Sequence, residues 1–96
     1  MNKKYIKYIN YIVDDIELPY LKSIEQYGLK QDEVVMVLSK LFKGPVTIIN
    51  RNDVYDINGN LIYYETINGY WIKYEYDPNG NIIYYEDSTG VIEDYR

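Results

Sequence analysis

The segment VYDINGNLIYYETING (residues 54–69) has a near copy, YEYDPNGNIIYYEDSTG, at residues 74–90. When the units 55–75 and 76–96 are aligned, eleven of their 21 positions are identical. A match of this quality at constant spacing indicates an internal repeat. In each copy, tyrosine and isoleucine flank an Asn-Gly pair, a pattern typical of two strands joined by a tight turn.

The phrase D-x-N-G-N predicts the turn itself. Asp56 and Asp77 can accept hydrogen bonds from the backbone of their own turns, and Gly59 and Gly80 can adopt the left-handed conformation. Side chains alternate between the two faces of a strand. We therefore expect residues 70, 72, 74 and 76 on one face of the sheet and residues 71, 73 and 75 on the other.

The first half of the chain has helical periodicity. Apolar residues recur from Lys3 to Ile16, a second short segment runs from Pro19 to about Tyr27 with Gly28 as its stop, and a third begins near Gln31. The apolar residues expected to face inward are Tyr5, Ile6, Tyr8, Ile9, Ile12, Val13, Ile16, Leu21, Ile24, Tyr27, Val34, Val35, Leu38, Leu41 and Phe42.

These patterns predict an α+β fold in a single domain spanning residues 1–96. Residues 1–44 form an N-terminal bundle of two to three short helices. Residues 45–96 form an antiparallel β-meander of about five strands, built on the 21-residue repeat.

Composition narrows the possible chemistry. The chain has neither histidine nor cysteine, which excludes disulfides, Ser-His-Asp and Cys-His catalysis and the usual zinc sites. No stretch approaches the roughly 18 apolar residues of a membrane span, and the opening residues lack the cleavage site of a signal peptide. We expect a cytoplasmic protein that is not an enzyme, has no cofactor and does not contact a membrane.

Charge is distributed unevenly along the chain. Residues 1–52 have a net charge of +2 and residues 53–96 a net charge of −7. Carboxylates repel phosphate, so we expect no direct binding of nucleic acid and a partner with a basic surface. The helical half has the layout of a helix-turn-helix, but its third helix opens with Gln31, Asp32 and Glu33 where base-contacting residues would stand. The alternative is that the acidic residues only keep a tyrosine-rich sheet soluble.

Calcium binding is the other interpretation of the turns. Asp56, Asn58 and Asn60, and their counterparts in the second copy, match positions 1, 3 and 5 of an EF-hand loop. The glycine and glutamate required at positions 6 and 12 are absent from both copies. We therefore expect no metal site.

The phrase YDxNGNxIYYExxxG over residues 54–96 resembles the YD repeat of Rhs and teneurin-type proteins. Those proteins use many units to build a shell, which two units cannot do. The phrase from Gly69 to Asn81 is similar to tandem motifs in small accessory proteins of bacteriophages and prophages. That resemblance implies a mobile-element protein expressed in a host cytoplasm.

We therefore expect a non-catalytic binder that antagonises a host protein such as a defence nuclease, as anti-CRISPR proteins do. Carboxylates on a sheet would mimic nucleic-acid phosphates, and aromatic side chains would anchor the contact. The expected anchors are Tyr64, Trp71, Tyr74 and Tyr85, and the expected charges are Asp56, Glu65, Glu75, Asp77, Glu86, Asp87, Glu93 and Asp94.

Two alternatives stay open. An assembly module would pair into a homodimer through the sheet edge at residues 91–95 or through the helices. A carbohydrate-binding module would stack sugar rings on an exposed Trp71.

Overall fold

The computed structural model describes residues 3–96, with side chains from Ile9 onward. Three helices, α1 (Lys3–Asp15), α2 (Tyr20–Glu25) and α3 (Gln31–Leu41), precede six strands. The strands are β1 (Val46–Ile49), β2 (Asp53–Asp56), β3 (Leu61–Glu65), β4 (Trp71–Tyr76), β5 (Ile82–Asp87) and β6 (Ile92–Asp94). The expected α+β fold, with helices followed by a β-meander, is confirmed.

The chain divides into two compact units, Met1–Val46 and Thr47–Arg96. The boundary lies two residues beyond the expected division between helices and sheet. That both units form a single domain stays a prediction. Each unit is described by itself below.

In the helical unit, α1 packs against α3. The predicted stripe is buried at Ile9, Ile12, Ile16 and Ile24, whereas Tyr5, Ile6 and Tyr8 lie outside the residues whose side chains are described. On α3 the buried pair is Val37 and Leu38. Leu38 was expected to face inward and Val37 was not, and the expected residues Val34, Val35, Leu41 and Phe42 are half-buried.

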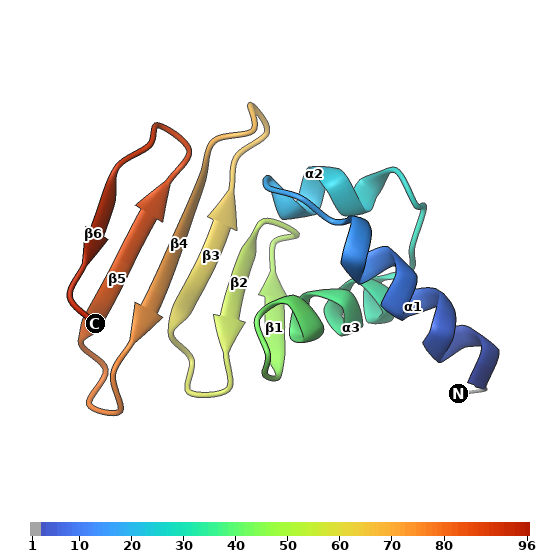
Figure 1. Cartoon of the computed structure of the whole chain (residues 1–96), viewed down its shortest axis with the longest axis horizontal. Helices are drawn as coiled ribbons and strands as arrows, with labels where there is room; N and C mark the ends of the chain where they lie inside the picture. Colours follow the sequence, from blue (N-terminus) through green and yellow to red (C-terminus); the bar gives the residue numbers. More distant parts are fainter. Residues whose placement is uncertain (1–2) are drawn as a thin grey trace. The chain divides into compact units, whose positions relative to one another are not determined.

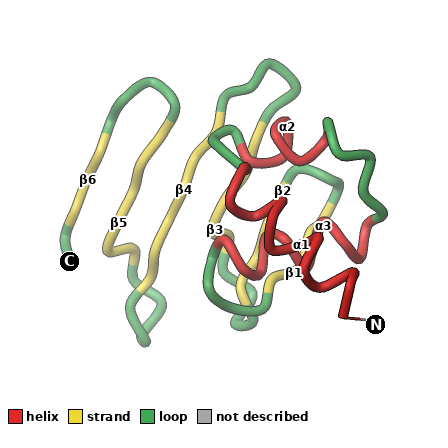
Figure 2. The backbone as a smooth tube through the Cα atoms, turned by 45° about the vertical axis from the view of Figure 1, so that its right-hand side comes forward, coloured by secondary structure: helices red, strands yellow, loops and turns green. Residues whose placement is uncertain are grey.

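The second unit is a meander in which sheet order follows chain order, from β1 to β6 (Figure 1). Short loops join consecutive strands at alternating ends of the sheet (Figure 2). There are six strands where about five were expected. The turn between β1 and β2 contains Asn50 and Arg51, which both adopt a positive φ (54° and 65°). This segment contains no glycine, the usual sign of such a turn.

Four turns of the meander share one geometry. Residues 56, 66, 77 and 87 each donate their N–H to the carbonyl four residues later, at 2.8–3.1 Å. The glycine three residues later adopts a positive φ of 83–96° and donates its N–H back to the first residue. In each turn a side-chain oxygen of the first residue accepts the N–H four residues on, at 2.9–3.4 Å. The 21-residue sequence repeat therefore contains two copies of a structural unit of 10 or 11 residues.

Candidate functional site

The register of the strands assigns each side chain to a face. Tyr64 lies opposite Ile72, and Tyr74 opposite Tyr85, so these residues share one face. Tyr63 and Glu65 lie opposite Lys73 and Trp71 and belong to the other. The alternation predicted for residues 70–76 is thus confirmed along β4.

The first of these faces carries a chain of aromatic contacts, which we call the tyrosine face: Tyr64, Tyr70, Tyr74, Tyr76 and Tyr85. The ring centroids are 6.3 Å apart for Tyr64 and Tyr70, 5.6 Å for Tyr74 and Tyr85, and 6.2 Å for Tyr74 and Tyr76. All five are half-buried, so their rings support one another while part of each meets solvent.

Hydrogen bonds hold the phenol groups of this face in place. The Tyr85 hydroxyl donates to Asp87 Oδ2 at 2.6 Å, and the Tyr76 hydroxyl to the Leu61 carbonyl at 2.6 Å. The bond to Asp87 raises the pKa of Tyr85 well above its ordinary value of 10.0. Burial raises the pKa of Tyr64. With a raised pKa, Tyr64 and Tyr85 remain neutral at physiological pH.

A tyrosine hydroxyl meets a carboxylate two residues away at four places in the sheet. Besides Tyr85 and Asp87, the pairs are Tyr63 with Glu65 (2.6 Å), Tyr84 with Glu86 (2.8 Å) and Tyr95 with Glu93 (3.2 Å). Residues two apart on a strand project from the same face, which makes each contact geometrically simple. The effect is to hold a negative charge at a defined position.

Asp56 and Asp77 belong to the turns. Asp56 Oδ1 accepts the N–H groups of Asn58 and Asn60 at 2.9 Å, and Asp77 repeats both contacts with Asn79 and Asn81. The backbone bond from Asn81 is the main cause that lowers the pKa of Asp77. The carboxylates thus serve the turns. Among the residues that the structure describes, no three acidic side chains form a group suited to a metal ion.

Three predicted contact residues are not exposed as expected. The Trp71 side chain is 9% exposed, Glu65 4% and Asp87 6%. Trp71 and Glu65 are neighbours in register on the face opposite the tyrosine face, so Trp71 does not join the other three anchors. This buried position contradicts the exposed Trp71 on which sugar stacking depends.

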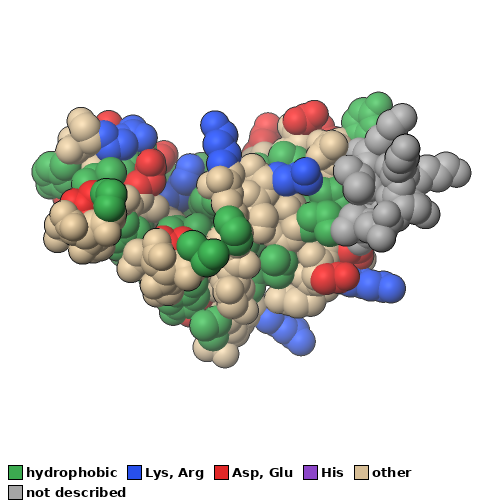
Figure 3. Space-filling view, turned by 90° about the horizontal axis from the view of Figure 1, so that it is seen from below, with side chains coloured by type: hydrophobic (Ala, Val, Ile, Leu, Met, Phe, Trp, Pro, Cys, Tyr) green, Lys and Arg blue, Asp and Glu red, His purple; other side chains and the backbone are tan. Residues whose placement is uncertain are grey.

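The remaining predicted charges are also divided. Glu75, Glu86 and Asp94 lie on the same face as Trp71, and Glu93 lies on the tyrosine face. Figure 3 shows acidic, basic and hydrophobic side chains mixed at the end of the sheet formed by β5 and β6. The carboxylates that were expected on one acidic surface therefore lie on both faces of the sheet and in its turns.

Sequence reasoning missed Tyr70, Tyr76 and Arg96. The first two complete the tyrosine face, and alternation along β4 already placed them beside Tyr74. Arg96 forms ion pairs with Glu75 and Asp94, at 3.1 and 3.0 Å. In the aligned repeats, Arg96 occupies the position that Glu75 holds in the first copy. This change from an acidic to a basic residue was the signal in the sequence.

Comparisons of the chain with protein-family models, with curated proteins and with solved structures find no significant match. None of the helices in the described part of the chain has the length and apolar character needed to cross a membrane.

Proposed function

We propose that this chain is a non-catalytic binding protein that antagonises a host protein with a basic surface, such as a defence nuclease. The observation that carries the proposal is the tyrosine face, on which five half-buried rings are aligned by ring contacts and hydrogen bonds. Tyrosine anchors that are already ordered lose little conformational entropy on binding, which is why they are enriched at interface hot spots.

Electrostatics supports a basic partner. The sheet unit, residues 47–96, carries nine acidic and three basic side chains, a net charge of −6. All eight carboxylates predicted as phosphate mimics have an intramolecular hydrogen bond or ion pair, and Glu75 and Asp94 pair with Arg96. Hydrogen bonds from neutral donors leave a charge in place while fixing its position. Such fixed negative charges favour fast association with a basic surface.

A capture experiment from bacterial lysate tests this proposal. The immobilised wild-type protein is compared with Tyr74→Ser/Tyr85→Ser, and with Tyr11→Ser as the control, because Tyr11 is 74% exposed and lies on α1. We expect a retained protein that is lost with the double variant, kept with the control and released by salt. Circular dichroism checks that the double variant is folded. If the folded double variant retains the same proteins as the wild type, the tyrosine face is not the binding surface.

Assembly is a second candidate, because one sheet edge is open. β6 pairs only with β5, and Ile92 and Tyr95 beside that edge are 59% and 67% exposed. An open edge of this kind is a template for pairing with another strand. Light scattering after size exclusion decides between the candidates. A dimer that Ile92→Lys converts to a monomer supports assembly, and a wild-type monomer at high concentration excludes it.

A further inference from the structure

A row of three side chains crosses β4, β5 and β6 on the face opposite the tyrosine face. Glu75 lies directly opposite Tyr84, and Tyr84 directly opposite Asp94. Directly opposed residues project from the same face with their Cβ atoms about 5 Å apart. The row therefore places one aromatic ring between two carboxylates.

The first copy of the repeat contains the same row with different flanks. Its members are Val54, Tyr63 and Lys73, which are also opposed in register. Val54 and Tyr63 are fully buried, so this row belongs to the core. Only the tyrosine is common to both rows. In the second copy both flanking positions are carboxylates, which packing does not require.

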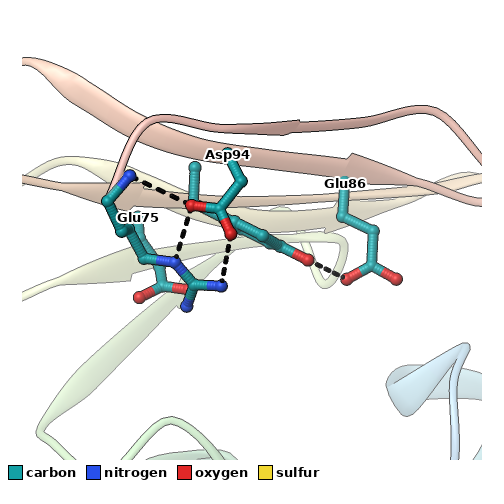
Figure 4. A network of polar contacts seen from close by, with 5 residues as sticks. Glu75, Glu86 and Asp94 are labelled. Carbon is teal, nitrogen blue, oxygen red and sulfur yellow. Dashed lines mark hydrogen bonds and ion pairs between the residues drawn. The ribbon is translucent and has the colours of Figure 1, made fainter.

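A guanidinium occupies the second row. One Arg96 nitrogen, Nη1, lies 3.1 Å from Glu75 Oε2. Nε and Nη2 donate to the two oxygens of Asp94 at 3.1 and 3.0 Å. The Arg96 Cζ atom lies 4.2 Å from the centroid of the Tyr84 ring. Figure 4 shows Glu75 and Asp94 beside one another, with Glu86 accepting the hydrogen bond from Tyr84 farther along the sheet.

This arrangement matches arginine in particular. A planar guanidinium can stack on a ring while two of its N–H groups bond one carboxylate and a third bonds another. A lysine ammonium has no plane to stack and no fork to match a carboxylate. The site is also accessible, because the side chains of Arg96, Glu75 and Asp94 are each about half exposed. Exposed ion pairs contribute little net free energy, so Arg96 can leave without unfolding the sheet.

We propose that the row Glu75–Tyr84–Asp94 is an arginine-binding site, which Arg96 occupies in the free protein and which an arginine of a basic partner takes over on binding. The site does not depend on the tyrosine face, because its residues project from the opposite side of the sheet. Arg96 then acts as an internal competitor. If it fills the site about 90% of the time, it weakens the affinity for an external arginine about tenfold.

An NMR titration with the peptide acetyl-Gly-Arg-Gly-amide tests the proposal, with acetyl-Gly-Lys-Gly-amide as the chemical control. The proteins are the wild type, Arg96→Ala, Arg96→Ala/Glu75→Gln, and Arg51→Ala as the matched control on the exposed turn between β1 and β2. We expect Arg96→Ala to bind the arginine peptide about tenfold more tightly than the wild type, with shifts at Tyr84 and Asp94. The lysine peptide should bind more weakly, Arg96→Ala/Glu75→Gln should lose the gain, and Arg51→Ala should behave as the wild type.

The variant Arg96→Lys adds a test that keeps the positive charge. We expect it to bind the arginine peptide with an affinity between those of the wild type and Arg96→Ala, because lysine competes for the site less well. The proposal is overturned if folded Arg96→Ala gains no affinity, or if arginine and lysine peptides bind it equally.

Discussion

The substitution Tyr63→Phe removes one oxygen atom from the centre of the sheet. The Tyr63 side chain is fully buried, and its hydroxyl donates to Glu65 Oε1 at 2.6 Å. Glu65 is itself only 4% exposed, so water cannot easily replace the lost donor. The ring and its packing are unchanged, and the variant therefore isolates the effect of the hydroxyl.

The expected loss of stability follows from the nature of this bond. A hydrogen bond to a charged group contributes about 1.5–3 kcal/mol, and a buried carboxylate that loses a donor falls within that range. For a chain of this size, 1 kcal/mol corresponds to a change in Tm of roughly 4–8 °C. Urea unfolding followed by Trp71 fluorescence measures the change directly, since Trp71 lies opposite Glu65 in register. We expect a lower midpoint with an unchanged m value.

The repeat supplies the control. Tyr84→Phe removes the equivalent hydroxyl, whose bond to Glu86 is 2.8 Å long and only part-buried. Water can replace it there, so we expect a clearly smaller loss of stability than for Tyr63→Phe. Equal losses in the two variants, or no loss in Tyr63→Phe, would falsify the assignment of a stabilising buried hydrogen bond to Tyr63 and Glu65.

Three further predictions concern the turns and the ionisable groups. Gly80→Ala forces a non-glycine residue to a φ of 86° and should lower the free energy of unfolding by about 1–2 kcal/mol. Gly44→Ala is the control in the same urea assay and should be nearly neutral, because Gly44 has no positive φ. The raised pKa of Tyr85 gives stability that is present below pH 10.0 and is lost as pH rises through the folded-state pKa. An absorbance titration should show one tyrosine that ionises late and that is absent from the curve of Tyr85→Phe. An unchanged curve in that variant would contradict this prediction. The hydrogen bonds from Thr89 and Tyr85 lower the pKa of Asp87, so the stability that Asp87 contributes is present above pH 3.8 and is lost as pH falls further. Asp87→Asn should therefore flatten the acid limb of the curve of stability against pH. An acid limb as steep as that of the wild type would count against this prediction.

Much of the fold could be predicted because its turns use local chemistry. An aspartate that bonds the N–H groups two and four residues later, followed by a glycine of positive φ, defines each Asn-Gly turn without help from the rest of the chain. The turn at Asn50 and Arg51 has neither signal. The deeper period of 10 or 11 residues was missed, because Thr66 takes the place of aspartate in one of the four turns.

The candidate site could be predicted only in part. Alternation placed Tyr74 beside Tyr76 and separated Trp71 from both, as the register confirms. It could not show that Trp71 and Glu65 are buried, since both faces of these strands carry aromatic and charged residues. Burial depends on what packs over a face, which the pattern along one strand does not contain.

From the sequence alone one can place the two Asn-Gly turns, the alternation of residues along β4 and the strong negative charge of the second half. These properties arise from neighbours within about four positions along the chain, or from simple counting. The tertiary structure was needed to show that each of the eight predicted carboxylates has a partner, and that Glu75, Tyr84 and Asp94 converge on Arg96. Contacts such as that between Glu75 and Arg96 join residues 21 positions apart, and they exist only once the register of three strands is set.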